Sequence, residues 1–144
     1  MTEEDLIREV HKICKRYNIE NYTINEDMSI DVDDDAIISH LMLNKIPVNF
    51  NNVAGTFDCS DNNIRSLKGC PKFTGGDFYC NSNYITKLPG TIERCRSFDC
   101  RFNELTSLEG APKIITESWY LNDSLRLFPE YKRYLLTKKI KEYC

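Results

Sequence analysis

This 144-residue chain has no uninterrupted apolar run that approaches the roughly 18 residues needed to span a bilayer. It also has no basic segment followed by an apolar one at its start, which is the pattern of a secretory leader. We therefore expect a protein that does not associate with membranes and that is located in the cytoplasm.

Residues that usually carry catalysis are scarce. The chain has two histidines, His11 and His40, and neither has a recognisable nucleophile or carboxylate partner near it in the sequence. No acid–base or nucleophilic constellation follows from the residue order. The sequence thus predicts no catalytic residues, no cofactor and no small-molecule substrate, and indicates a protein that is not an enzyme.

A metal centre is also not predicted, because the seven cysteines contain no close Cys-x-x-Cys pair. Residues 31–35 copy the first three ligand positions of a calcium loop, but Ala36 and Met42 replace its glycine and its bidentate glutamate. We interpret this stretch as a surface acidic run, which leaves a weak cation site there open. Cys144, at the exposed chain end, is the expected reactive thiol.

Charge is low overall and unevenly spread. The net charge of -3 argues against a nucleic-acid partner, because binding to phosphates requires a basic surface. Residues 1–35 hold 11 acidic residues against 4 lysines and arginines, whereas residues 130–144 hold 5 basic residues against 2 acidic ones. The two ends of the chain therefore carry opposite charge.

What the chain does contain is a block of about twenty residues that recurs. Three copies begin Phe-x-Cys-x-x-Asn, and their anchor cysteines, Cys59, Cys80 and Cys100, are 21 and 20 residues apart. One eroded copy precedes them, and another starts at Trp119 with Leu121 in the cysteine position. A period of this length predicts a solenoid, in which each turn is stable only through its neighbours.

The asparagine of each block, at positions 62, 83 and 103, follows the expected strand. Its side-chain amide can bond backbone groups in the turn after the strand, where no sheet partner is available. Stacking should place these asparagines one above another at strand spacing, about 4.8 Å, and the cysteines in a second column. The cysteines then lie in the apolar interior, as small buried side chains.

The full pattern, Phe-x-Cys-x-x-Asn-x-Ile/Leu-x-Ser-Leu-x-Gly-x-Pro, resembles a family of leucine-rich-repeat-like proteins of tailed bacteriophages and bacteria. Residues 57–115 carry this resemblance, and residues 22–47 look like the N-terminal cap of those proteins. The chain departs from the pattern at 88–95 and in the block from Trp119. The resemblance implies a repeat fold, a phage or bacterial origin and a binding role without catalysis.

We expect one domain over residues 1–144, of the α+β repeat class, as a short leucine-rich-repeat-like solenoid with a parallel sheet. Residues 1–35 should form a cap of a helix over 3–17 and a β-hairpin, with Thr2 and Asp5 at the start of the helix. Residues 36–128 should form about five repeats, and residues 129–144 a helical cap over the other end.

Function is expected on the strand residues that face away from the interior. Strand side chains alternate, so inward Phe57 and Cys59 leave a column of outward residues, Asp58, Tyr79, Asp99 and Tyr120. Tyrosine is a frequent anchor at protein interfaces, although tyrosines also simply cover neighbouring strands. The predicted partner-binding residues are Asp58, Asp77, Tyr79, Asn81, Asp99, Arg101, Phe102, Tyr120 and Asn122.

Two functions fit these features. The first is a non-catalytic protein–protein interaction module; with the family resemblance, this implies a phage accessory protein that binds and blocks a host defence protein in the bacterial cytoplasm. The alternative is a structural protein that self-associates as a homo-oligomer within a phage particle. The sequence does not identify the partner.

Overall fold

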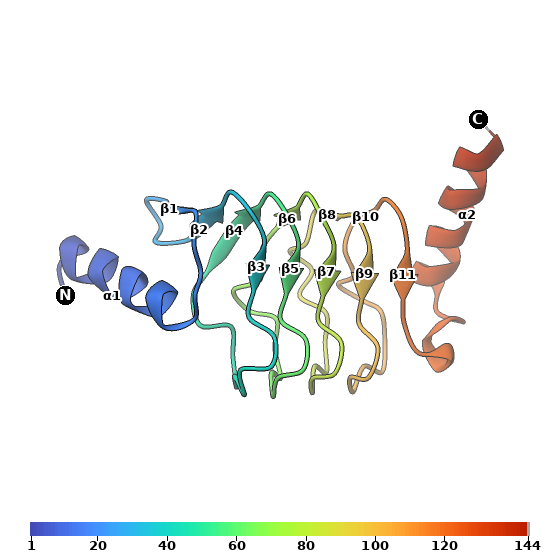
Figure 1. Ribbon diagram of the computed structural model, residues 1–144. Coiled ribbons are helices and arrows are strands. Elements are labelled where there is room, and N and C mark those ends of the chain that lie inside the picture. The colour runs from blue at the N-terminus through green and yellow to red at the C-terminus, as the bar shows by residue number, and fades with distance from the viewer. Residues whose placement is uncertain (144) are drawn as a thin grey trace.

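The computed structural model describes the backbone of residues 1–143 and the side chains of residues 1–139. The chain forms an elongated solenoid with one helix at each end (Figure 1). No helix in the described part of the chain is long and apolar enough to cross a membrane. The elements are α1 (Glu3–Arg16), β1 (Tyr22–Ile24), β2 (Ile30–Val32), β3 (Ala36–Ile37), β4 (Phe50–Val53), β5 (Phe57–Asp58), β6 (Phe73–Thr74), β7 (Phe78–Tyr79), β8 (Arg94–Cys95), β9 (Phe98–Asp99), β10 (Ile114–Ile115), β11 (Trp119–Tyr120), a short 3-10 helix (Asp123–Leu125) and α2 (Pro129–Tyr143).

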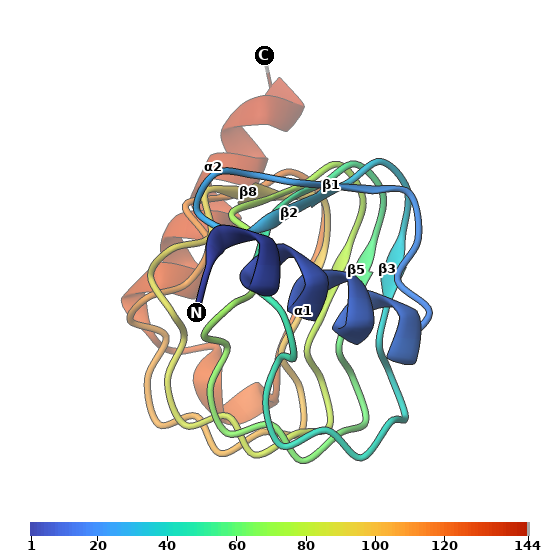
Figure 2. The ribbon, with the colours of Figure 1, turned by 90° about the vertical axis from the view of Figure 1, so that its left-hand side faces the viewer.

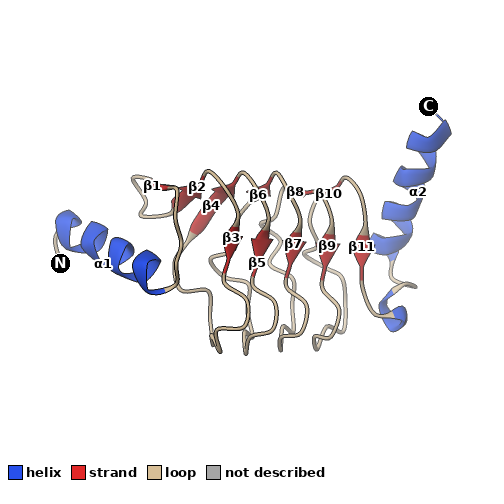
Figure 3. Ribbon diagram, in the orientation of Figure 1, coloured by secondary structure: helices blue, strands red, loops and turns tan. Residues whose placement is uncertain are grey.

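Each turn contributes a short strand to each of two sheets (Figure 3). Sheet A has the order β1-β2-β4-β6-β8-β10 and is parallel except for the β1–β2 hairpin; sheet B is parallel with the order β3-β5-β7-β9-β11. The five strands of sheet B delimit four full turns of the solenoid. Sheet B is the predicted sheet, whereas sheet A was not anticipated because β6, β8 and β10 are two residues long and lack the Phe-x-Cys signature.

The corner between the two sheets brings the backbones of neighbouring turns into close approach. A Cβ atom on Gly75 would lie 2.1 Å from the carbonyl oxygen of Ala54, so only glycine fits there. In the next turn the corner is one residue shorter, and Arg96 takes the position of Gly76. The N–H of Arg96 donates to the carbonyl oxygen of Gly76 at 3.1 Å. This deletion accounts for the change of the cysteine spacing from 21 to 20 residues.

The interior is built from two stacked columns. The rings of Phe50, Phe57, Phe78, Phe98 and Trp119 follow one another with centroids 5.0 to 6.3 Å apart, in tilted and edge-on contacts. The three anchor cysteines are fully buried beside them, as predicted. Burial raises the pKa of the thiols of residues 70, 95 and 100 to about 12, so these thiols stay uncharged. The thiol expected to react, Cys144, lies outside the described residues.

The asparagine column is confirmed, and each asparagine does more than was predicted. In its own turn, Asn83 donates from Nδ2 to the carbonyl oxygens of Cys80 and Asn81, at 3.2 and 3.3 Å. In the preceding turn, the same amide donates to Cys59 O at 3.0 Å and accepts from the N–H of Ile64 at 3.0 Å. Asn62 and Asn103 repeat this arrangement. The asparagines thus join successive turns as well as closing their own.

Both end caps form as predicted. The first helix, α1, begins with a capping box in which Thr2 Oγ1 accepts from the N–H of Asp5 at 3.2 Å and the Asp5 carboxylate accepts from the N–H of Thr2 at 3.1 Å. Figure 2 shows α1 lying across the N-terminal end of the stack. At the other end, Tyr131 and Tyr134 of α2 each pack edge-on against Trp119 at 5.7 Å. The caps cover the apolar ends that a solenoid would otherwise expose.

Replacing Asn83 with alanine should lower the free energy of unfolding by about 2–4 kcal/mol, because buried backbone groups of two turns lose their partners. Urea denaturation followed by circular dichroism measures this change. The neighbouring Asn63 is exposed, so Asn63→Ala is the matched control and should change stability by less than about 0.5 kcal/mol. Equal effects of the two substitutions would contradict the bridging role.

Candidate functional site on the outer face of sheet B

The strand pairing of sheet B aligns the predicted column of outward residues. Asp58 pairs with Tyr79, Tyr79 with Asp99, and Asp99 with Tyr120. Ile37 pairs with Asp58 and extends the column toward the N-terminus, with half of its side chain exposed. The sequence missed Ile37 because the first repeat lacks the Phe-x-Cys signature. The geometry of the column is therefore as predicted, and its role in binding stays a prediction.

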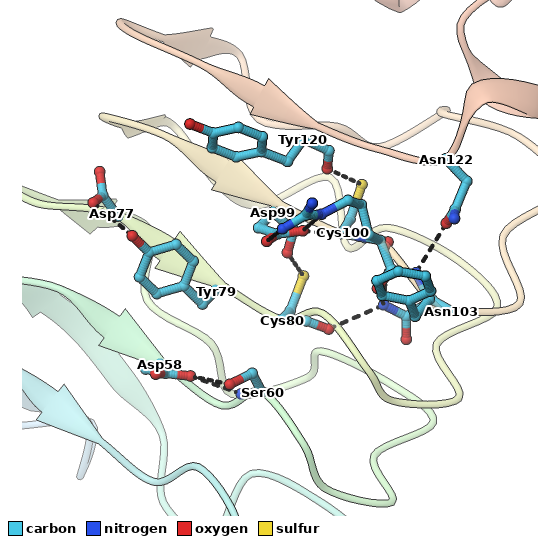
Figure 4. Close-up of polar contacts among 12 residues, drawn as sticks. Asp58, Ser60, Asp77, Tyr79, Cys80, Asp99, Cys100, Asn103, Tyr120 and Asn122 are labelled. Carbon is cyan, nitrogen blue, oxygen red and sulfur yellow. Dashed lines mark hydrogen bonds and ion pairs between the residues drawn. The ribbon is translucent and has the colours of Figure 1, made fainter.

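A cation is held between two aromatic rings on this face. Arg101 bonds Asp99 in a bidentate manner, with Nη2 2.7 Å from Oδ2 and Nε 3.0 Å from Oδ1. Its guanidinium carbon lies 5.2 Å from the ring centroid of Tyr120 and 5.9 Å from that of Phe102. Figure 4 shows Asp99 and Tyr120 on neighbouring strands. The carboxylate orients the guanidinium, which in turn lies against both rings, so the three exposed groups form one ordered cluster.

A second ion pair supports Tyr79. Its hydroxyl donates to Asp77 Oδ2 at 2.9 Å (Figure 4), and the same carboxylate accepts from Nε and Nη2 of Arg96 at 2.9 and 3.0 Å. The hydrogen bonds from Arg96 hold the pKa of Asp77 below its usual value. Burial, followed by the bond to Asp77, raises the pKa of Tyr79. The role of Arg96 was not predicted from the sequence. The signal that could have indicated it is an arginine in place of a glycine, at a corner where the repeat is one residue shorter.

Two of the predicted contact residues are much less exposed than expected. Asp77 is 9% exposed and Asp99 is 4% exposed. Both point outward as strand alternation requires, but each carboxylate accepts from an arginine laid over it and from a backbone N–H. These aspartates therefore orient the arginines and Tyr79, and a partner would touch the groups that they hold.

Phe102 occupies a strained position at the edge of the face. Its φ is +58°, and the equivalent residues of the other turns, His40, Asp61 and Ser82, have φ of +56°, +55° and +58°. Short polar side chains tolerate this left-handed backbone better than a phenylalanine does. The Phe102 side chain is nevertheless 62% exposed, so burial of its ring within the chain does not offset the strain. Strained residues of this kind cluster at functional sites.

The remaining predicted residues are Asp58 in the column and Asn81 and Asn122 just beyond the ends of their strands. Asn122 Oδ1 accepts from the N–H of Phe102 at 2.9 Å and so fixes the backbone of that residue. Asp58 Oδ1 accepts from the N–H and the hydroxyl of Ser60, at 2.9 and 2.6 Å. Asn81 is half-buried two residues beyond Tyr79. Of the three, Asn122 has a structural use that the sequence did not indicate.

The acidic run separates into unrelated hydrogen bonds. Asp31 Oδ1 accepts from Nδ2 of Asn51 and the N–H of Asn52, at 2.9 and 3.1 Å, while Asp35 Oδ1 accepts from the N–H of Thr56 at 2.8 Å. Within the described residues, no three histidine, cysteine or acidic side chains are arranged to hold a metal ion.

The histidines have partners that the sequence did not reveal. His40 Nε2 lies 3.3 Å from Asp61 Oδ2, and His11 Nδ1 lies 2.6 Å from the hydroxyl of Tyr22. The sequence shows no carboxylate partner near His40, and the structure supplies one from the next turn of the solenoid. Its side chain is 74% exposed, so the pair lies on the surface.

Comparisons with models of protein families, with curated proteins and with solved structures find no match to this chain. The geometry of the outer face, with aromatic and cationic groups held by buried carboxylates, is therefore the basis on which a function is proposed.

Asp77→Asn should reduce the dependence of stability on pH. Because the folded-state pKa of Asp77 is lowered, the ionised carboxylate stabilises the fold above its unfolded pKa of about 3.8, and this contribution is lost as pH falls through the folded pKa. The variant should melt at a lower temperature at pH 7 but lose less on acidification to about pH 2.5. Thermal melts at both values test this; the exposed control Asp33→Asn should follow the wild type.

Proposed function

We propose that this chain is a non-catalytic module that binds a partner protein through the outer face of sheet B. The observation that carries the proposal is the cluster of Arg101 between the rings of Tyr120 and Phe102, with Tyr79 on the other side of Asp99. Tyrosine and arginine are the residues most enriched among energetically dominant interface contacts. Here Tyr120 is exposed, while Tyr79 and Arg101 are half-buried and already ordered by hydrogen bonds to aspartates, which reduces the entropy lost on binding.

The spacing of the aromatic groups favours a protein over a small molecule. Tyr79 and Tyr120 lie on strands β7 and β11, with β9 between them. Two strand spacings amount to about 10 Å. Aromatic groups this far apart on the face of a sheet are suited to several side chains of a partner surface. The half-exposed arginines of the pairs Asp77–Arg96 and Asp99–Arg101 provide charges that fix orientation.

The biological setting that we propose is that of a phage accessory protein that binds and blocks a host defence protein. Support for this setting comes from the resemblance of the repeats in residues 57–115 to those of phage and bacterial leucine-rich-repeat-like proteins. The same resemblance supports membership of that repeat family, a cytoplasmic location and the absence of catalysis, all of which we include in the proposal. The alternative is a structural protein that self-associates within a phage particle, for which the acidic segment 1–35 and the basic segment 130–144 offer complementary charge.

The double variant Tyr79→Ala/Tyr120→Ala should lose its partner while remaining folded. Removing two anchor rings typically costs about 2–4 kcal/mol of binding free energy, or a loss of at least about thirtyfold in affinity. Affinity capture from a bacterial lysate with wild type and variant in parallel, followed by mass spectrometry, tests this. Tyr84→Ala is the matched control, because Tyr84 is 49% exposed but lies in the turn after β7, away from the column.

Retention of the same partner by the folded double variant would remove the site from consideration. Retention of the bait alone, together with a mass in light scattering that grows with concentration, would favour the self-association alternative.

Phe102→Asn should stabilise the chain and weaken binding at the same time. Asparagine adopts the left-handed backbone at lower cost, so the free energy of unfolding should rise by about 1 kcal/mol. Loss of the ring removes one side of the Arg101 cluster, so affinity for the captured partner should fall. Denaturation and binding measured on the same preparation test both halves; higher stability with unchanged affinity would assign Phe102 no part in the interface.

A further inference from the structure

The C-terminal end of sheet A is an open strand edge. In β10, the N–H groups of Ile114 and Thr116 donate to Glu93 O and Cys95 O of the preceding turn, both at 3.1 Å. Backbone groups of successive residues in a parallel strand point to alternate sides, so the N–H and C=O of Ile115 point away from β8. In the part of the chain that the structure describes, sheet A ends at β10 and no further strand pairs with it. Ile115 therefore offers an unused donor and acceptor.

A groove runs between this edge and α2. Figure 1 shows α2 standing beside the last turn of the solenoid, next to β10 and β11. The groove contains a pocket of about 450 Å³, within the range of roughly 300–1,000 Å³ that is common for ligand sites. Ile115, Trp119 and Tyr134 give it apolar walls, and a smaller hollow continues past Thr116. The hydroxyl of Tyr134 donates to Glu117 O at 2.6 Å and holds the helix beside the strand.

Two elements of the fold form the sides of the groove. One is the edge of β10 and the other is α2, which is fixed by the packing of its tyrosines on Trp119. An extended chain is the element that bonds to a strand edge, and the helix stands on the far side of the pocket, so we infer that the occupant is a single extended chain beside β10. A second solenoid approaching end-on would meet α2 before it reached the strand.

Two buried polar atoms of residues that line the pocket have no hydrogen-bond partner within the described residues, the donor Trp119 Nε1 and the acceptor Glu130 Oε2. Glu130 belongs to the first turn of α2. A buried carboxylate oxygen without a donor costs free energy, which a ligand with a suitably placed hydroxyl or N–H would recover. The surrounding walls are aromatic and aliphatic, so the complementary ligand group has an apolar body with a donor at its tip.

The rim of the groove is basic. Lys113, Arg133 and Lys138 line the pocket and its continuation. Lys113 pairs with Glu93 at 3.0 Å, and Glu117 in the continuation pairs with Arg96 at 3.8 Å, so Arg133 and Lys138 provide the positive charge of the rim. Residues 130–144, which include all of α2 except Pro129, carry five lysines and arginines against two glutamates. A rim of this charge attracts acidic residues and repels basic ones, so the donor that meets Glu130 belongs to a neutral side chain such as tyrosine.

We propose that this groove binds an extended acidic segment of a partner protein, which adds one strand to sheet A at β10. The backbone of the segment bonds to the N–H and C=O of Ile115. A tyrosine of the segment packs against Trp119 and Tyr134 and donates from its hydroxyl to Glu130 Oε2. Acidic residues on either side of that tyrosine meet Arg133 and Lys138. The site is separate from the outer face of sheet B and goes beyond the proposed function.

The test uses the full chain and a synthetic peptide with blocked ends, Asp-Glu-Val-Tyr-Val-Glu-Asp. Trp119 is the only tryptophan of the chain and lines the pocket, so its fluorescence reports binding directly. Hydrogen exchange reports the added strand, because the Ile115 amide, which is unprotected by the ladder in the free chain, should exchange at least about tenfold more slowly in the complex.

Three comparisons define the mode of binding. The peptide with phenylalanine in place of tyrosine should bind about tenfold more weakly to the wild type, and this difference should vanish for Glu130→Ala. Arg133→Glu should weaken binding of the acidic peptide about tenfold at low salt and improve binding of a lysine-flanked analogue. The double variant Tyr79→Ala/Tyr120→Ala should bind the peptide as the wild type does, so that this site and the sheet B site are tested independently.

Three outcomes would overturn the proposal: unchanged exchange at Ile115 with saturating peptide, equal affinity for the acidic and lysine-flanked peptides, or concentration-dependent protection of Ile115 in the absence of peptide. The last would show that a second copy of the chain occupies the edge instead.

Discussion

The asparagine that closes each turn is the constraint on which the rest of this molecule depends. Asn83 bonds backbone groups of its own turn and of the turn before it, so it fixes how far one turn can slide or rotate on the next. Strand register follows from that restriction, and register decides which side chains share a column on the surface. The alignment of Tyr79 with Asp99 and Tyr120 thus depends on the side-chain amides of the asparagines in the turns that follow the strands.

The arginines and Tyr79 on the outer face of sheet B are held in place by carboxylates that lie beneath them. Asp77 and Asp99 are nearly inaccessible, and each holds an arginine by two hydrogen bonds. Arg96 reaches Asp77 because it replaces a glycine at a corner that is one residue shorter than its neighbours. An irregularity in the repeat therefore creates part of the face on which we propose that a partner binds.

The sequence predicted the elements that repeat or that carry local signals. Equal spacing of the cysteine and asparagine positions predicted the stacked columns, and Thr2 with Asp5 predicted the start of α1. Features created by contacts between turns were missed, because residues about twenty positions apart meet only after stacking. These features include sheet A, the pairing of His40 with Asp61, the burial of Asp77 under Arg96, and the groove between β10 and α2.

Every rung of sheet B joins residues 20 or 21 positions apart, from Ala36–Phe57 to Phe98–Trp119. Each turn therefore docks its strands on the turn made just before it, and the following turn then supplies the asparagine that bonds its remaining backbone groups. A growing polypeptide can fold in order, with α1 and the hairpin serving as the first template and α2 covering the last turn of the stack. At any moment the growing chain then exposes the apolar surface of only about one turn, which lowers its tendency to aggregate.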